Sequence, residues 1–126
     1  MNLNAINWFE IPATDIARAQ RFYEAVLEAP LRREEMGDST LAVFPYEQEQ
    51  GTGGCLIAGP GTAKPSADSG TLVYLNAGPS LDKLLARVER AGGRIATPKV
   101  ALPEGMGFFA HVIDSEGNKV GFHSLA

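Results

Sequence analysis

Cysteine is almost absent from this chain. Cys55 is the only one in 126 residues, which excludes an internal disulfide and a metal site built from several thiolates. No stretch approaches the roughly 20 consecutive apolar residues that a helix needs to span a bilayer. Residues 1–4 lack the basic and apolar regions of a signal peptide. We therefore expect a cytoplasmic protein that has no membrane partner.

Positive charge is also scarce. The chain has 11 Lys and Arg against 15 Asp and Glu, for a formal net charge of −4. Arg32 and Arg33 are followed at once by Glu34 and Glu35, so they form no basic patch. Because binding to a phosphate backbone needs a concentrated basic surface, the sequence argues against nucleic acid as a partner. The 44% hydrophobic residues are typical of a globular domain.

The first half of the chain predicts a strand, a helix and three strands. Thr14 or Asp15 can cap the helix, and apolar residues recur along it at helical spacing. Ala29 and Pro30 end it, because the residue before a proline disfavours the helical region. The expected strands cover 6–12, 31–36, 40–44 and 55–58.

The second half repeats this order. Ser80 opens a second helix, and Gly92 and Gly93 close it. The expected strands cover 72–76, 94–102, 108–113 and 119–123. Asp15 and Ser80 match each other as helix caps, at a shift of 65 residues. The sequence therefore predicts an α+β fold in which two βαβββ modules form one domain over residues 1–126. The modules cover about 4–58 and 71–126, and residues 59–70 link them.

Three segments of the chain resemble proteins of the vicinal oxygen chelate superfamily, which includes glyoxalases, bleomycin-resistance proteins and extradiol dioxygenases. These segments are residues 7–27, 74–93 and 108–120. The resemblance implies a cup-shaped mixed sheet around a cavity, and a homodimer. In metal-dependent members, His, Glu or Gln ligands on the cup face hold a divalent ion that chelates two oxygens of the substrate.

The positions that match the metal ligands carry other residues here. They fall at Trp8, at or near Leu72, at Gly121, and within Cys55–Ala58. Indole, an apolar chain and glycine offer no ligand to a divalent metal. The sequence therefore predicts a cup without the usual metal site. No cofactor is expected, although a displaced divalent metal remains open.

Strand alternation predicts which side chains face the cup. Five residues share that face and are the candidate ligand contacts: Trp8, Glu10, Tyr74, Asn76 and His123. Glu10 and His123 are also the candidate catalytic acid and base, and a structural hydrogen-bond network is the alternative for this set. If Asp114 pairs with Lys119 across the last turn, His111 lies on the opposite face, towards helix or solvent.

Three functions fit these features. The first is binding of a small, partly apolar molecule without metal, in the manner of bleomycin-resistance relatives. The second is an enzyme, namely a lyase, isomerase or dioxygenase that uses a displaced metal or proton transfer by Glu10 and His123. The third is a structural or regulatory module with a vestigial cavity.

Overall fold

The computed structural model describes residues 5–126. Residues 1–4 lie outside the described part. The expected start of the first module near residue 4 therefore lies outside the described residues. So does the segment from which the lack of a signal peptide was inferred. No helix within the described residues is long and apolar enough to cross a membrane.

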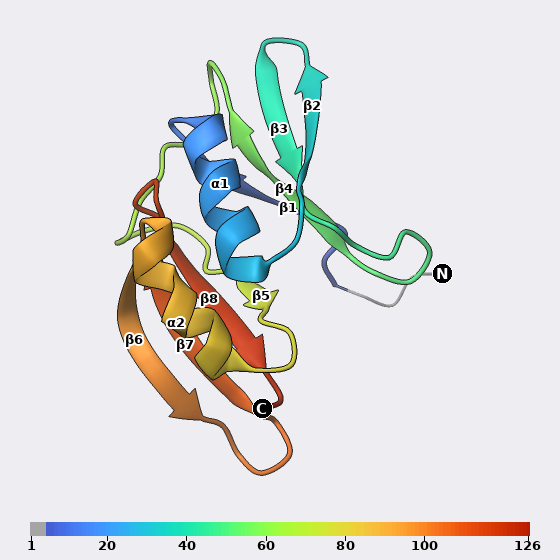
Figure 1. Ribbon diagram of the computed structural model, residues 1–126. Helices are drawn as coiled ribbons and strands as arrows, with labels where there is room; N and C mark the ends of the chain where they lie inside the picture. The colour runs from blue at the N-terminus through green and yellow to red at the C-terminus, as the bar shows by residue number, and fades with distance from the viewer. Residues whose placement is uncertain (1–4) are drawn as a thin grey trace.

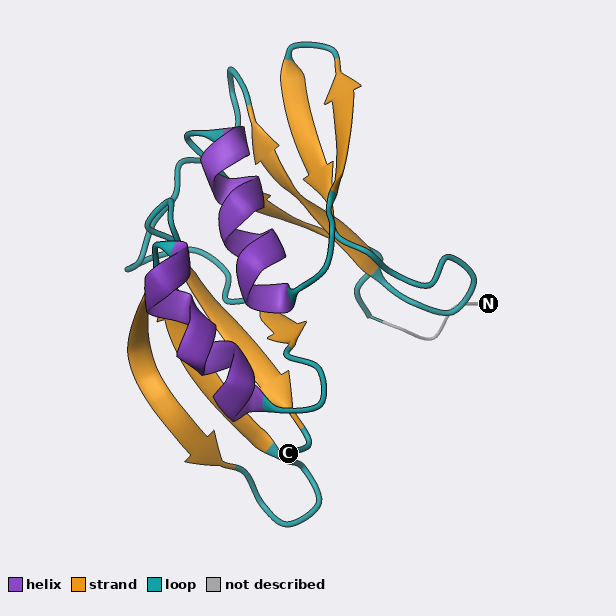
Figure 2. Cartoon of the chain, viewed as in Figure 1, coloured by secondary structure: helices purple, strands orange, loops and turns teal. Residues whose placement is uncertain are grey.

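Ten elements follow one another along the chain (Figures 1 and 2). The first module contains β1 (Trp8–Pro12), α1 (Ile16–Leu27), β2 (Arg32–Met36), β3 (Ser39–Val43) and β4 (Gly53–Ala58). The second contains β5 (Tyr74–Asn76), α2 (Leu81–Ala91), β6 (Arg94–Ala101), β7 (Phe108–Ile113) and β8 (Lys119–Ser124).

Each module forms a four-stranded mixed sheet, and the two sheets share one topology. The strand orders are β1-β4-β3-β2 and β5-β8-β7-β6. In each module the first strand pairs in parallel with the last, and the remaining pairs are antiparallel. The predicted α+β architecture of two βαβββ units is therefore confirmed.

The helices begin where local sequence signals predict. The Asp15 carboxylate accepts a hydrogen bond from the Arg18 amide, and the Ser80 hydroxyl accepts one from the Lys83 amide. Each cap satisfies a backbone amide that has no partner within the first helical turn. Gly92 ends α2 in the left-handed conformation, with φ of 108°, which costs glycine little.

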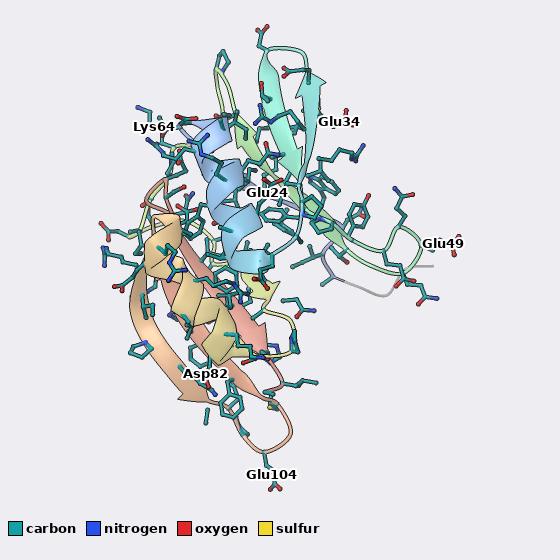
Figure 3. All side chains as sticks on the ribbon, in the orientation of Figure 1. Glu24, Glu34, Glu49, Lys64, Asp82 and Glu104 are labelled. Atoms are coloured by element: carbon teal, nitrogen blue, oxygen red, sulfur yellow. The ribbon has the colours of Figure 1, made fainter. Side chains whose placement is uncertain are left out.

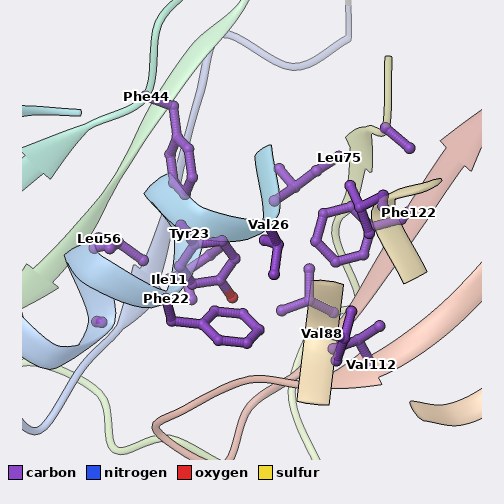
Figure 4. Close-up of a cluster of buried hydrophobic side chains, with 14 of the residues drawn as sticks. Ile11, Phe22, Tyr23, Val26, Phe44, Leu56, Leu75, Val88, Val112 and Phe122 are labelled. Carbon is purple, nitrogen blue, oxygen red and sulfur yellow. The ribbon is translucent and has the colours of Figure 1, made fainter. Parts of the chain in front are cut away.

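One hydrophobic core joins the modules. The helices lie side by side and cover the same face of both sheets (Figure 1). Phe22, Val26 and Val88 from the helices meet Phe122 from β8, and each is at most 1% exposed (Figure 4). Burial of such a side chain contributes about 1.5–3 kcal/mol. The side of each sheet that faces the helices therefore forms part of the core.

The β7–β8 turn fixes the relative position of the modules. The fully buried Glu116 carboxylate accepts hydrogen bonds from the amides of Thr14 and Asp15 and from the Arg18 guanidinium. Burial alone would raise the pKa of Glu116, but the hydrogen bonds from Arg18 and Asp15 outweigh it and lower the pKa. This carboxylate caps the first helix from the second module.

The structure corrects several strand limits. β1 begins at Trp8 rather than Ile6, and β5 covers only Tyr74–Asn76. β4 begins at Gly53, within a segment that was expected to be a loop. A Cβ on Gly53 would lie 2.8 Å from the Trp8 ring, and one on Gly54 would lie 2.3 Å from the Phe9 ring. Aromatic rings occupy the space of a side chain at both positions, so glycine is the residue that fits there in the strand.

Candidate functional site

A large pocket lies on the face of the second sheet that is turned away from the helices, here called the helix-distal face. Its volume is about 970 Å³. Side chains from three strands and from the β6–β7 loop line it, including Tyr74, Asn76, Leu102, Met106, Phe109 and His123. Glu104 projects from the same loop at the edge of the molecule (Figure 3).

Strand alternation brings these side chains to one face. Val120 and Phe122 point into the core, so Gly121 and His123 point away from it. Phe109 pairs with His123 across β7 and β8. Tyr74 and Asn76 on β5 pair with Gly121 and His123. Three of the five predicted ligand contacts, Tyr74, Asn76 and His123, thus line one pocket.

Tyr74 lies over Gly121 and is held there. A Cβ on Gly121 would be only 2.4 Å from Cδ1 of the tyrosine ring, so no larger side chain fits beneath it. The ring also meets Phe109 edge-on, with centroids 6.0 Å apart. Tyr74 remains 48% exposed, which leaves much of its surface available to a ligand.

The structure overturns the expected orientation of His111. Ile113, not Asp114, pairs with Lys119, so His111 pairs with Gly121 and shares the face of Tyr74. A shift of one residue in register turns every side chain to the other face of a strand. The Nε2 atom of His111 lies 2.8 Å from the Tyr74 hydroxyl.

His111 is linked on its other side to β6. Its Nδ1 atom lies 3.0 Å from the Thr97 hydroxyl. Burial, assisted by the charge of Lys119, lowers the pKa of His111 below its ordinary value, which favours the neutral imidazole at neutral pH. A neutral imidazole carries one donor and one acceptor nitrogen, so the ring can connect the two hydroxyls.

His123 and Asn76 already have partners within the chain. The Nε2 atom of His123 is 2.7 Å from the Met106 carbonyl oxygen, and this contact ties β8 to the β6–β7 loop. The Asn76 side-chain oxygen accepts a hydrogen bond from the Gly78 amide. Both residues therefore help to shape the rim of the pocket.

Trp8 and Glu10 lie on the helix-distal face of the first sheet. Trp8 is 42% exposed and meets Tyr46 edge-on. Glu10 lines a second pocket of about 460 Å³, together with residues of the linker such as Lys64 and Ser66. The roles of Trp8 and Glu10 as ligand contacts, and of Glu10 and His123 in catalysis, stay predictions.

The residues at the expected ligand positions do not fit a divalent metal. Gly121 is covered by a ring, and Trp8 and Leu72 offer no ligand atom. Burial raises the pKa of the Cys55 thiol, which disfavours the thiolate that a metal requires. Residues 5–126 contain no group of three or more His, Cys, Asp or Glu that could hold an ion.

Comparisons with solved structures show that other proteins share this fold. A glyoxalase/bleomycin resistance/dioxygenase domain from Frankia sp. EAN1pec is 19% identical, with a TM-score of 0.72 over 97% of this chain and 92% of that one. An integron cassette protein of V. cholerae is 17% identical, with a TM-score of 0.64 over 100% and 98%. At these identities the likeness shows the fold alone.

Glyoxalase I from Zea mays is 21% identical, with a TM-score of 0.68 over 94% of this chain. This chain spans only 45% of the length of the maize protein. No curated protein matches the sequence. The model of the Glyoxalase/Bleomycin resistance protein/Dioxygenase superfamily matches residues 5–122. The chain belongs to that superfamily, as the sequence resemblance predicts.

Sequence reasoning missed several pocket residues. Phe109 is not among the five ligand contacts expected from the sequence, but it lines the pocket. Leu102 and Met106 come from a loop whose position depends on the contact between His123 and the Met106 carbonyl, so no local signal identifies them. The orientation of His111 can be inferred from the sequence of the turn before β8, because that turn sets the pairing register of β7 and β8.

Proposed function

We propose that this protein binds a small, flat, partly apolar molecule in the pocket on the second sheet, without a metal at the usual position. The observation that carries this proposal is the pocket of about 970 Å³ with aromatic walls. Ligand sites typically have volumes of about 300–1,000 Å³, with apolar walls and a few polar groups. Tyr74 and Phe109 supply flat surface, while Asn76 and His123 supply polar atoms.

The same observation supports binding over a vestigial cavity. A vestigial cup would be filled by its own side chains, as the part of the first sheet's equivalent face around Val43, Cys55 and Ile57 is. The face of the second sheet remains open. This contrast supports a binding role for the second module.

A neutral fluorescent probe tests the proposal. N-Phenyl-1-naphthylamine is flat and apolar, and its fluorescence rises in an apolar site. We expect saturable binding that weakens in Phe109→Leu, because stacking area is lost. Phe108→Leu is the matched control, since Phe108 packs against the core instead. An absence of saturable binding, or equal binding by both variants, would contradict the proposal.

A second candidate function is acid–base catalysis in the same pocket, as a lyase or isomerase. The hydrogen bond between Tyr74 and His111 favours it, because a neutral imidazole beside a phenol can exchange a proton with it. Turnover of a bound carbonyl compound, detected as exchange of its α-hydrogen with deuterium in heavy water, would distinguish catalysis from binding.

We further propose a cytoplasmic homodimer. Exposed apolar side chains outside the pocket lining, such as Trp8 and Leu72, support burial against a second copy. Light scattering coupled to size-exclusion chromatography would measure the mass. A monomer at micromolar concentration would contradict the dimer without affecting the pocket.

A further inference from the structure

Three polar side chains from three different strands form a continuous chain beside the pocket. The Tyr74 hydroxyl from β5 contacts Nε2 of His111 on β7 at 2.8 Å. The Nδ1 atom of the same ring contacts the Thr97 hydroxyl on β6 at 3.0 Å. Of these three, Tyr74 reaches the pocket wall. This series of hydrogen bonds therefore runs from β6, at the outer edge of the sheet, to the pocket.

The direction of the hydrogen bonds decides what Tyr74 presents to a ligand. When the Thr97 hydroxyl donates to Nδ1, the Nε2–H of His111 donates to the Tyr74 oxygen, and the Tyr74 proton is free for a ligand. In the opposite sense Tyr74 donates to His111, and the spare proton is that of Thr97 at the outer sheet edge. The first arrangement places the spare proton on the pocket wall, where a ligand oxygen can accept it, and each bond polarises the next.

The pocket wall favours an uncharged ligand. Its lining includes no Lys, Arg, Asp or Glu side chain among the described residues. The lowered pKa of His111 keeps its ring neutral near pH 7, so the relay adds no fixed charge. An anionic ligand would lose its hydration without gaining a partner of opposite charge. The Ala126 carboxylate on the lining already accepts hydrogen bonds from the Leu81 amide and the Ser124 hydroxyl.

The flat surfaces beside the hydroxyl favour a conjugated ligand. Tyr74 and Phe109 meet edge-on at 6.0 Å, and Phe109 and His111 lie 5.3 Å apart. A conjugated ligand that stacks on this cluster would bring an oxygen at its edge to the Tyr74 hydroxyl.

We propose that Thr97, His111 and Tyr74 form a hydrogen-bond relay through which the pocket donates to the carbonyl oxygen of an uncharged, conjugated ligand. The relay rests on the binding function proposed above and adds the ligand class and two positioning residues. Tyr74 contacts the ligand, while His111 and Thr97 act through it.

A carbonyl chromophore tests the relay. The absorption of 4-(dimethylamino)cinnamaldehyde moves to longer wavelength when its carbonyl oxygen accepts a hydrogen bond. We expect the unmodified protein to bind the dye with such a shift. Tyr74→Phe keeps the ring over Gly121 but removes the donor, so the shift disappears and the dissociation constant rises about 3- to 10-fold.

The other variants report on positioning. Thr97→Val keeps the shape of the side chain and removes its donor, so the shift becomes smaller while binding persists. His111→Leu, which disconnects the relay, reduces the shift further. Tyr46→Phe is the matched control, because it removes a hydroxyl from an exposed tyrosine of the other module. It leaves both the shift and the affinity unchanged.

The two probes distinguish a failure of the relay from a failure of the binding function. If N-phenyl-1-naphthylamine binds but the aldehyde shows the same spectrum with Tyr74→Phe as with the unmodified protein, the relay is overturned and the binding function stands. If neither probe binds, both proposals fail. Thermal unfolding of each variant confirms that it is folded, so that a lost shift reports on the hydroxyl.

Discussion

The two modules share one backbone plan but use their helix-distal faces differently. The Ala13 amide donates to the Ile57 carbonyl, and the Ala77 amide donates to the His123 carbonyl in the same way. Ile57 and His123 are therefore equivalent positions. By the same register, the apolar set Leu41, Val43 and Cys55 in the first module corresponds to Phe109, His111 and Gly121 in the second.

The residues at these equivalent positions produce different surfaces on the two sheets. In the first module, Val43, Cys55 and Ile57 are at most 7% exposed and form a small hydrophobic cluster of their own. In the second module, the corresponding side chains are aromatic, polar or absent, and two of them, Phe109 and His123, line the pocket. A few side chains thus decide whether a βαβββ sheet presents a filled face or an open one.

An exchange at the equivalent positions 57 and 123 should produce the largest effect. Ile57→His removes apolar burial and places an imidazole in a dry cluster, so we expect a loss of about 2–4 kcal/mol in unfolding free energy. His123→Ile loses only the bond to the Met106 carbonyl, so its cost is about 1 kcal/mol or less. Urea denaturation measures both values. Equal losses would mean that the two faces are not different environments.

A smaller effect is expected from Gly121→Ala. The new Cβ would lie 2.4 Å from the Tyr74 ring, so the ring must move, at a cost of about 1–3 kcal/mol. N-Phenyl-1-naphthylamine binding should weaken at the same time. Cys55→Ala is the control at the equivalent position, where a Cβ is already accommodated. Unchanged probe binding by Gly121→Ala would show that the position of Tyr74 does not shape the pocket.

Local signals in the sequence predicted most of the fold. Asp15, Ser80 and Gly92 act within one helical turn, so their capping roles can be read without knowing the tertiary structure. The strand order followed from the repeat of helix and strand patterns. Gly53 is the exception, because glycine is favoured in this strand position by the close approach of the Tyr46 and Trp8 rings, which no local signal reveals.

The site was harder to predict because it depends on pairing between strands. The β7–β8 connection contains a three-residue loop, residues 115–117, in which Gly117 has φ of 94°. The Asp114 amide closes the loop by donating to the Asn118 carbonyl. Such loops pair a type I turn with a left-handed glycine. Assigning this turn to Gly117 would have paired Ile113 with Lys119 and turned His111 to the correct face.

The smallest expected effect concerns protonation of His111, which has an apolar equivalent in Val43. Burial and then the charge of Lys119 lower the pKa of His111 from its ordinary value of 6.5. Above that pH the ring is neutral in both the folded and unfolded chains. As the pH falls below 6.5, the unfolded chain takes up the proton first, so this residue's contribution to stability is progressively lost until the folded pKa is passed.

NMR titration of the His111 Cε1 proton measures this directly, because the chain has only two histidines and His111→Gln assigns the signal. We expect a midpoint below 6.5. Lys119→Gln should raise the midpoint, since one of the two causes is removed while burial remains. His111→Gln should also flatten the fall in unfolding free energy just below that pH. A midpoint at or above 6.5 would mean that the imidazole is not held neutral beside Tyr74, and the face of the second module would then resemble solvent more than a binding site.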